Sequence, residues 1–333
     1  MKILVTGASG FVGGRVLELG GEGTFGTGRR PPVEEVAQQP SRNQGTRYLG
    51  GVDLGRIENG EIPGLAELMD GQPDAVIHCA ARAAPYGSKV QFQRDNVDAT
   101  RNVVEFCERH GRPRLVYVSS SSVLYRDGDQ LDLTEESPVG PGFANDYART
   151  KAAGEEITRT YSGSWVIARP RAVFGPGDTV LFPRIITAAK AGKLPLLTGR
   201  TTPAMGDVIY VDNLAAYLLQ LAHRPELSGV YHLTNGAPID MQSLLLQVLD
   251  RLGFARPDRE VSLSTALRAA TLIERTWRVV RLRGEPPITR YGVGVLAWSK
   301  TFDPTKMLTD LGPPAISIDE GIERFVAWQK ERL

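Results

Sequence analysis

The stretch Ile3-Leu4-Val5-Thr6-Gly7-Ala8-Ser9-Gly10-Phe11-Val12-Gly13 joins a β-rich run to a helix with periodic apolar residues. Glycine is needed where a chain turns tightly, where its backbone approaches a pyrophosphate and where a helix packs closely on its strand. The start of the helix then offers free N–H groups and a positive dipole to the anion. This placement predicts a dinucleotide site formed by Gly7, Ser9, Gly10, Phe11, Val12 and Gly13.

Short β-rich runs alternate with helical patterns through the first half of the chain, and this order predicts βαβ units around a parallel sheet. We expect an α/β fold with a doubly wound Rossmann sheet in residues 1–175. Residues 176–333 should form a smaller, mostly helical substrate-binding lobe that is interleaved with the sheet. The expected strands are 2–6, 24–27, 47–50, 75–79, 115–119 and 165–169, and the expected helices are 96–110 and 144–161.

The composition excludes several classes of protein. A net charge of +1 over 333 residues gives no field that would attract nucleic acid. No apolar run approaches the ~18 residues of a membrane span, so we expect a cytoplasmic protein without a stable membrane anchor. Two cysteines make no disulfide framework, and the four histidines have no metal-ligand spacing, so we expect no metal site.

The end of the second expected strand bears on the choice of cofactor. An acid that holds the ribose of NAD should stand about 20 residues after the glycines. Here the sequence is Gly26-Thr27-Gly28-Arg29-Arg30, without an acid. Two guanidiniums suit a 2′-phosphate, so we expect NADP, with NAD as the second option. The alternative is that Arg29 and Arg30 form a solvated turn.

A Tyr–Lys pair and a serine run indicate proton and hydride transfer. Tyr147 and Lys151 are four residues apart, on one helical face. The usual phenol pKa, near 10, is too high for a base at neutral pH, and we expect the Lys151 ammonium to lower the pKa of Tyr147. The run Ser119-Ser120-Ser121-Ser122 follows an expected strand and can place a hydroxyl on a substrate oxygen.

These motifs, in this order, resemble the extended short-chain dehydrogenase/reductase family of NAD-dependent epimerases and dehydratases. The resemblance implies that Ser120, with Ser121 as the fallback, acts with Tyr147 and Lys151 in catalysis. It also implies that Asp53 and Leu54 lie near the adenine, Ala80 and Ala81 near the ribose and Pro170 beside the nicotinamide. Asn96 should lie on a helix that supports the site, and it is expected among the cofactor-binding residues. Further expected cofactor contacts come from Ser119, Tyr147, Lys151, Ala172 and Val173.

Within that family, the chain is most similar to 3β-hydroxysteroid dehydrogenase-like members and 2-alkyl-3-ketoacid reductases. The similarity rests on Leu181–Arg184, on Arg283–Arg290 and on the amphipathic stretch 266–282, which we expect to be a helical lid over the pocket in preference to a membrane-contacting helix. It implies a small apolar ketone or alcohol as substrate, sterol-like or an alkyl 3-keto acid. Relatives often dimerise through helices such as 92–110 and 144–161, so the resemblance allows a homodimer.

Two other functions compete with this interpretation. A nucleotide-sugar epimerase or dehydratase usually carries an arginine for the diphosphate where this chain has Gly206. A non-catalytic NADP sensor would need neither a tyrosine nor a lysine for proton transfer. Turnover of a ketone or an alcohol distinguishes the sensor from the enzyme.

Overall fold

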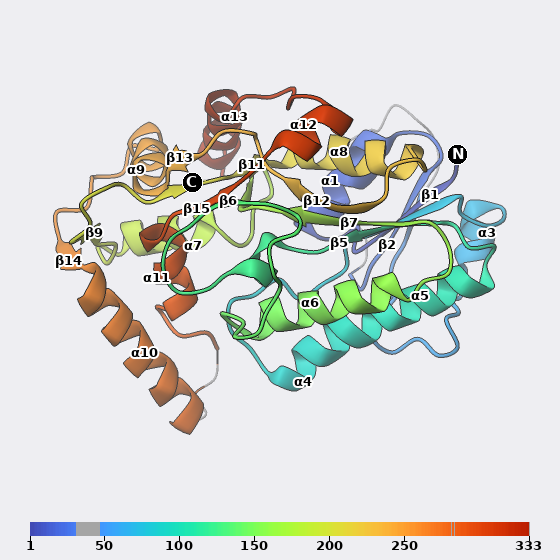
Figure 1. Cartoon of the computed structure of the whole chain (residues 1–333), viewed down its shortest axis with the longest axis horizontal. Coiled ribbons are helices and arrows are strands. Elements are labelled where there is room, and N and C mark those ends of the chain that lie inside the picture. Colours follow the sequence, from blue (N-terminus) through green and yellow to red (C-terminus); the bar gives the residue numbers. More distant parts are fainter. Residues whose placement is uncertain (31–46, 281, 283, 333) are drawn as a thin grey trace.

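The structure is a computed structural model, and it describes residues 1–30, 47–280, 282 and 284–332. Its centre is a parallel sheet of seven strands in the order β12-β7-β5-β4-β1-β2-β3 (Figure 1). The Rossmann-type α/β fold predicted from the sequence is therefore confirmed. The strands are β1 (Ile3–Thr6), β2 (Thr24–Thr27), β3 (Tyr48–Leu49), β4 (Ala75–His78), β5 (Arg114–Val118), β7 (Trp165–Pro170) and β12 (Gly229–Leu233).

Helices cover both faces of this sheet because successive strand residues point to opposite sides. On one face, Ile3 and Val5 pack with residues of α1 (Phe11–Gly20) and α8 (Val211–His223). On the other face, Leu4 packs against α5 (Ala99–Arg109). Beside α5 runs α6 (Asp146–Arg159), and Figure 1 shows the two helices together below the sheet. Shorter elements complete this half: α3 (Leu65–Met69), α4 (Lys89–Phe92), the π-helical η1 (Gln93–Asp98) and the 3₁₀ turn η2 (Ser121–Leu124).

The expected helix 96–110 begins earlier than the sequence indicates. The helical path starts at Lys89, passes through the π-helical residues 93–98 and continues as α5 to Arg109. A π-helical stretch has a wider turn than an α-helix and is frequent at functional sites. It turns Asp95 and Asn96 inward, and both are buried.

The second lobe holds small sheets as well as helices. A four-stranded sheet has the order β13-β10-β15-β6, and the pairs β11-β8 and β14-β9 are separate. The strands of these three small sheets are β6 (Gln130–Leu133), β8 (Val173–Phe174), β9 (Leu196–Thr198), β10 (Met205–Gly206), β11 (Ile209–Tyr210), β13 (Ile239–Asp240), β14 (Glu260–Ser262) and β15 (Lys300–Phe302). Its helices are α7 (Phe182–Lys190), α9 (Met241–Arg251), α10 (Leu263–Val280), α11 (Arg290–Ala297), α12 (Thr305–Leu311) and α13 (Ile318–Lys330).

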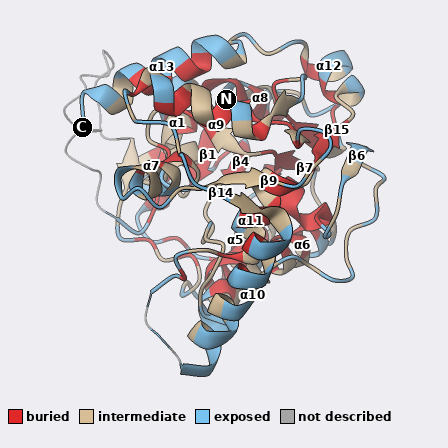
Figure 2. Ribbon diagram, turned by 90° about the vertical axis from the view of Figure 1, so that its left-hand side faces the viewer, coloured by how far each residue is buried: buried red, intermediate tan, exposed pale blue. Residues whose placement is uncertain are grey.

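The two halves of the chain exchange strands. Strand β12, from the second half, pairs with β7 from Val166 to Pro170, while β6, from the first half, pairs with β15 in the smaller sheet. Buried residues therefore run from the main sheet into the second lobe, as the red segments of Figure 2 show. One residue that carried the sequence resemblance, Arg283, lies outside the described residues.

The described helical part of the amphipathic stretch 266–282 belongs to α10, and its residues do not cover the large cavity as a lid would. Helix α10 projects from the body of the molecule (Figure 1), and its Ala266 and Ala270 pack against Val293 and Ala297 of α11. Farther along α10, Leu272, Val279 and Val280 are exposed. None of the described α10 residues lines the large cavity, whereas Tyr291, Gly292, Val295 and Leu296 of α11 do. Helix α10 therefore supports the helix that forms the cavity wall.

None of the described helices combines the length and the apolar content that a membrane crossing requires.

Candidate active site

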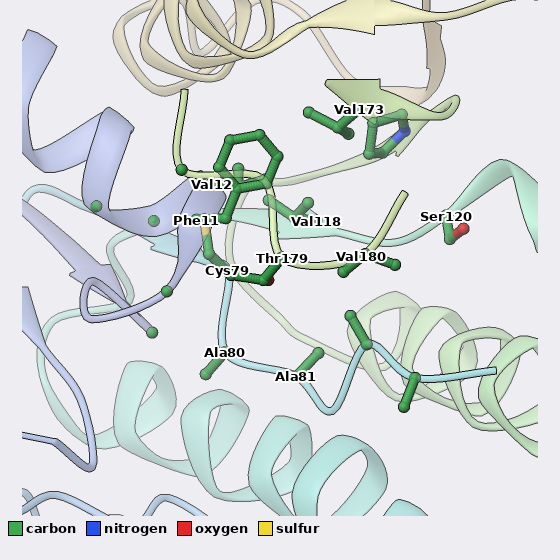
Figure 3. A pocket seen from close by; sticks show the side chains of 18 of the residues that line it. Phe11, Val12, Cys79, Ala80, Ala81, Val118, Ser120, Val173, Thr179 and Val180 are labelled. Atoms are coloured by element: carbon green, nitrogen blue, oxygen red, sulfur yellow. The ribbon is translucent and has the colours of Figure 1, made fainter. Parts of the chain in front are cut away.

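A cavity of about 1850 Å³ lies at the carboxyl ends of the sheet strands, between the two lobes. Open parallel sheets bind their ligands at this edge. In Figure 3, Phe11 and Val12 lie to the left and Ser120 to the right, with Ala80 and Ala81 below them. The predicted site residues that line the cavity are Gly7, Ser9, Gly10, Phe11, Val12, Gly13, Arg29, Arg30, Asp53, Leu54, Ala80, Ala81, Ser119, Ser120, Tyr147, Lys151, Pro170, Ala172 and Val173.

The glycine loop packs tightly because two of its positions have no space for a side chain. Gly7 has φ +69°, and a Cβ there would come within 2.6 Å of the Ala80 Cα atom. A Cβ on Gly13 would come within 2.5 Å of the Gly7 carbonyl oxygen. The loop thus packs directly on the Ala80 segment and on its own helix. This is the cradle that a pyrophosphate needs.

Three arginines line the cavity near the ends of β2 and β3. Arg29 and Arg30 follow β2, and Arg47 precedes β3. The Arg29 Nη1 atom lies 3.3 Å from Asp95 Oδ2, and Arg82 and Arg94 bind the same carboxylate at 2.9 and 2.7 Å. Sequence reasoning missed Arg47 and Asp95. Arg47 stood in an expected strand, and Asp95 is turned inward only by the π-helical stretch.

Asn96 does not line the cavity. Its side-chain oxygen accepts the Arg82 N–H at 2.7 Å, and its amide donates to Thr150 Oγ1 at 2.9 Å. Arg82 belongs to the segment after β4 that forms one wall, and Thr150 lies on α6 beside Lys151. Asn96 therefore ties the wall to the helix that carries Tyr147. The cofactor contact expected of Asn96 stays a prediction.

Tyr147, Lys151 and Glu155 occupy successive turns of α6, which begins at an Asn145 cap that accepts the Ala148 N–H. The Lys151 Nζ atom stands 4.2 Å from the centre of the Tyr117 ring. Burial lowers the pKa of Lys151 to about 7, against the opposing charge of Glu155. Burial raises the pKa of Tyr147 to about 12, and the neighbouring Ser120 hydroxyl opposes that rise. The expected lowering of the phenol pKa by Lys151 is not seen in the structure, because desolvation dominates for both groups.

Glu155 was not predicted, although its position four residues after Lys151 is a signal that could have found it. The Arg169 Nε and Nη2 atoms bind its two oxygens at 2.8 and 2.7 Å, and the Ser119 hydroxyl donates to it at 2.6 Å. Glu155 and Arg169 are both fully buried. The hydroxyl of Ser119 is therefore already hydrogen-bonded to Glu155, behind the cavity.

The serines of the run differ in whether they line the cavity and in which hydroxyl each contacts. Ser120 and Ser121 line the cavity, whereas Ser122 does not. The Ser120 and Ser122 hydroxyl oxygens are 2.9 Å apart, and the Ser121 hydroxyl lies 3.1 Å from the Tyr125 hydroxyl. Ser120 is thus the cavity-lining serine whose hydroxyl interacts with Tyr147, whereas the Ser121 hydroxyl lies beside Tyr125.

The sequence profile of the NAD dependent epimerase/dehydratase family matches residues 3–235. The chain belongs to this family. A 2-alkyl-3-oxoalkanoate reductase of Stenotrophomonas maltophilia is 35% identical over 98% of this chain and 99% of its own length. A 3beta-hydroxysteroid-dehydrogenase/decarboxylase (isoform 2) of Arabidopsis thaliana is 33% identical over 76% of this chain and 48% of its own. The family membership predicted from the motifs, including the similarity to these two subgroups, is confirmed.

Solved structures of the epimerase/dehydratase family share the fold. DesIV, a dTDP-glucose 4,6-dehydratase from Streptomyces venezuelae solved with NAD, superposes with a TM-score of 0.74 at 22% identity, covering 99% of this chain and 97% of that one. The Bordetella bronchiseptica enzyme WbmH, solved with NAD+, gives a TM-score of 0.72 at 20% identity, covering 99% and 98%.

Proposed function

We propose that this protein is an NADP-preferring oxidoreductase that interconverts a ketone and a secondary alcohol on a bulky apolar substrate, sterol-like or an alkyl 3-keto acid. The observation that carries the proposal is that Ser120, Tyr147 and Lys151 line the same cavity as the glycine loop. The two relatives described above are a reductase and a dehydrogenase by name, and this supports the proposal. A bound nicotinamide dinucleotide would supply or accept the hydride.

The roles of the three side chains follow from their chemistry. The Tyr147 hydroxyl gives its proton to the ketone oxygen in reduction and takes it back in oxidation. Ser120 donates a hydrogen bond to the same oxygen and holds it beside the phenol. Lys151 would favour the phenolate when it is charged, and Glu155, fixed by Arg169, favours the charged form of Lys151.

Cofactor preference is proposed from the charge around β2 and β3. Arg29, Arg30 and Arg47 give this part of the cavity three guanidiniums, and only Arg29 is paired with a cavity carboxylate, Asp95, among the described residues. A 2′-phosphate would add the missing negative charge through charge-assisted hydrogen bonds. Arg29 is exposed, as a solvated turn would be, but its contact with Asp95 beside the cavity supports the proposal.

An apolar substrate also suits the part of the cavity wall that the second lobe forms. Its cavity wall is largely apolar, with Val180, Leu181, Ile185, Val295 and Leu296. Gly206, where a nucleotide-sugar enzyme usually carries arginine, packs against Met241, and a Cβ there would lie 2.8 Å from the Met241 sulfur. That position has no space for a diphosphate-binding side chain in the present packing.

A substrate panel tests the proposal. We expect the purified protein to turn over apolar 3-keto or 3-hydroxy compounds with NADP(H), followed by nicotinamide absorbance, and to leave UDP-sugars unchanged. Conversion of a UDP-sugar without any activity on the apolar compounds would contradict the proposal. Cofactor binding without turnover of any panel member would favour the NADP-sensing alternative.

A further inference from the structure

Exposed apolar side chains gather at the far end of helix α10. Ten large apolar residues are exposed among the described residues, and four of them stand within one stretch of eleven: Leu272, Val279, Val280 and Leu282. Val279 is 81% exposed and Leu272 is 67% exposed. The helix projects from the body of the molecule (Figure 1), and its far end is mostly pale blue in Figure 2. Apolar residues that gather on a surface in this way mark a site of contact with another molecule or with a membrane.

The exposed apolar side chains lie on a different face of α10 from the one that packs on α11. Ala266 and Ala270 contact α11, and Leu272 follows Ala270 by a little more than half a turn. Val279 stands two turns after Leu272, with Val280 next to it, so these three side chains lie on the side turned away from α11. We call Leu272, Val279 and Val280 the outer face. The hydrophobic clusters of the described residues include none of the three.

Positive charge flanks the outer face. Three arginines of α10 are exposed, and their spacing of seven and three residues places them along one side of it: Arg268, Arg275 and Arg278. None of the three has a salt-bridge partner among the described residues. Two acids of this region have other partners, since Glu274 accepts the Arg290 N–H at 2.9 Å and Glu285 binds Arg184. This end of α10 therefore combines exposed apolar side chains with unneutralised positive charge.

An anionic lipid bilayer suits both properties of the outer face. Leucine and valine side chains gain free energy by entering the boundary between headgroups and acyl chains, and arginines beside them are attracted to anionic headgroups. A second copy of this chain suits them less well, because an isologous contact would add three further arginines to the same patch. Since α10 projects from the body, its end can also meet a flat surface.

We propose that the outer face of α10 attaches the protein reversibly to the surface of a membrane that contains anionic lipids. Leu272, Val279 and Val280 enter the headgroup region, and the three arginines contact lipid phosphates. Helix α10 packs on α11, which forms part of the cavity wall, so attachment holds this wall near the bilayer. The inference goes beyond the proposed function, because it concerns a surface outside the cavity.

Co-sedimentation of the full chain with sucrose-loaded vesicles tests the attachment. We expect vesicles of about three parts phosphatidylcholine to one part phosphatidylglycerol to bind the protein at least about tenfold more tightly than pure phosphatidylcholine does, and high salt to weaken the binding. Leu272→Gln combined with Val279→Gln should lower the partition coefficient by about tenfold or more. Arg275→Gln combined with Arg278→Gln should remove most of the preference for anionic vesicles.

Matched variants make the same chemical changes at other exposed positions. Val90→Gln with Leu131→Gln replaces exposed apolar side chains on α4 and β6 and should leave vesicle binding unchanged. Arg256→Gln with Arg324→Gln removes the same net charge outside α10 and should preserve the preference for anionic vesicles. Because every substituted side chain is exposed, all four double variants should melt close to the unmodified protein.

Three results would overturn the proposal. The first is equal binding to anionic and neutral vesicles, and the second is binding that survives the loss of Leu272 and Val279. The third is a protein that binds neither kind of vesicle. In that case, a dimer that Leu272→Gln with Val279→Gln converts to a monomer in sedimentation velocity would assign the outer face to a second copy. Vesicle binding is measured without substrate or cofactor, so no result of this test bears on the proposed oxidoreductase activity.

Discussion

Tyr147 and Lys151 stand one turn apart on α6, and burial is the main cause of the pKa shift of each. Burial raises the pKa of the phenol to about 12 and lowers the pKa of the ammonium to about 7. Near neutral pH the phenol is therefore protonated, which suits a proton donor in ketone reduction, and the lysine is only partly charged. Oxidation of an alcohol needs the phenolate, so we expect it to be favoured at higher pH than reduction.

Replacing the phenol tests its role directly. Tyr147→Phe keeps the ring and its packing but removes the proton, so kcat should fall by about 10²–10⁴-fold while NADP(H) affinity stays nearly unchanged. Steady-state kinetics on a confirmed substrate and fluorescence titration of the cofactor measure the two quantities. Retention of more than about a third of the turnover would remove Tyr147 from the mechanism.

Arg29 and Arg30 should determine the preference for NADP(H). A charge-assisted contact contributes about 1.5–3 kcal/mol, which corresponds to a preference of about ten- to a hundredfold. Arg29→Ala should remove most of that preference by raising the Kd for NADP(H), with NAD(H) binding little changed. Arg30→Ala is the matched variant that shows which guanidinium contacts the phosphate. Tighter binding of NADH than NADPH by the unmodified protein would contradict the assignment.

At the scale of elements, the π-helical η1 and Asn96 hold the cavity wall against α6. Asn96→Ala leaves the Arg82 N–H without its acceptor and Thr150 without its donor. We expect the free energy of unfolding to fall by about 1–3 kcal/mol and KM for the substrate to rise. Urea denaturation and steady-state kinetics measure these changes.

Asn213→Ala is the matched control for that variant. Asn213 is a buried asparagine on α8 that donates to Asn235 and to the Ile316 carbonyl, and it does not line the cavity. Its loss should lower stability by a similar amount without changing KM. An unchanged KM in Asn96→Ala as well would show that the wall does not depend on this tie.

The long central elements could be predicted because their signal is local. The runs that became β1, β4 and β5 are apolar strands bounded by turns, and the Gly7–Gly13 loop follows directly from its neighbours. The small sheet of the second lobe could not be predicted in this way. Its strands β6 and β15 are far apart in the sequence, since Gln130 pairs with Lys300, and they have only four and three residues. Strands that short show no usable alternation.

The same distinction holds for the site. Tyr147 and Lys151 are recognisable because a helix places residues four apart on one face. Tyr291 comes from α11 and reaches the cavity only after folding, so no spacing indicates it. The expectation that 266–282 forms a lid was wrong for a related reason: amphipathic periodicity shows that a helix packs on something, and here the partner is α11 and not the cavity.

At the scale of the whole molecule, two buried histidines should make stability depend on pH. His78 and His232 are each 1% exposed, and burial lowers the pKa of both to about 3. Below the unfolded pKa of 6.5, the unfolded chain binds protons that the folded chain excludes, so the free energy of unfolding falls as the pH falls toward 3. The loss is about 1.4 kcal/mol per pH unit for each histidine.

The variant His232→Gln removes one of these two groups. Denaturant unfolding at pH 7, 5.5 and 4 should show a dependence on pH that is shallower by about 1.4 kcal/mol per unit in the acidic range. His223→Gln, which changes an exposed histidine on α8, should behave as the unmodified protein does. If His232→Gln and the unmodified protein lose stability at the same rate, His232 does not make this contribution.

The exchange of strands also has a consequence for synthesis on the ribosome. The outer edge of β7 is paired by β12 from Val166 to Pro170, and α8, which precedes β12 in the chain, covers the adjoining face with Leu214, Leu218 and Leu221. A nascent chain therefore carries an open strand edge and an uncovered apolar face until Leu233 has left the exit tunnel. Exposed edges of this kind promote aggregation. A recombinant fragment that stops at residue 175 should consequently collect in inclusion bodies, whereas one extended through α8 and β12 has its sheet complete.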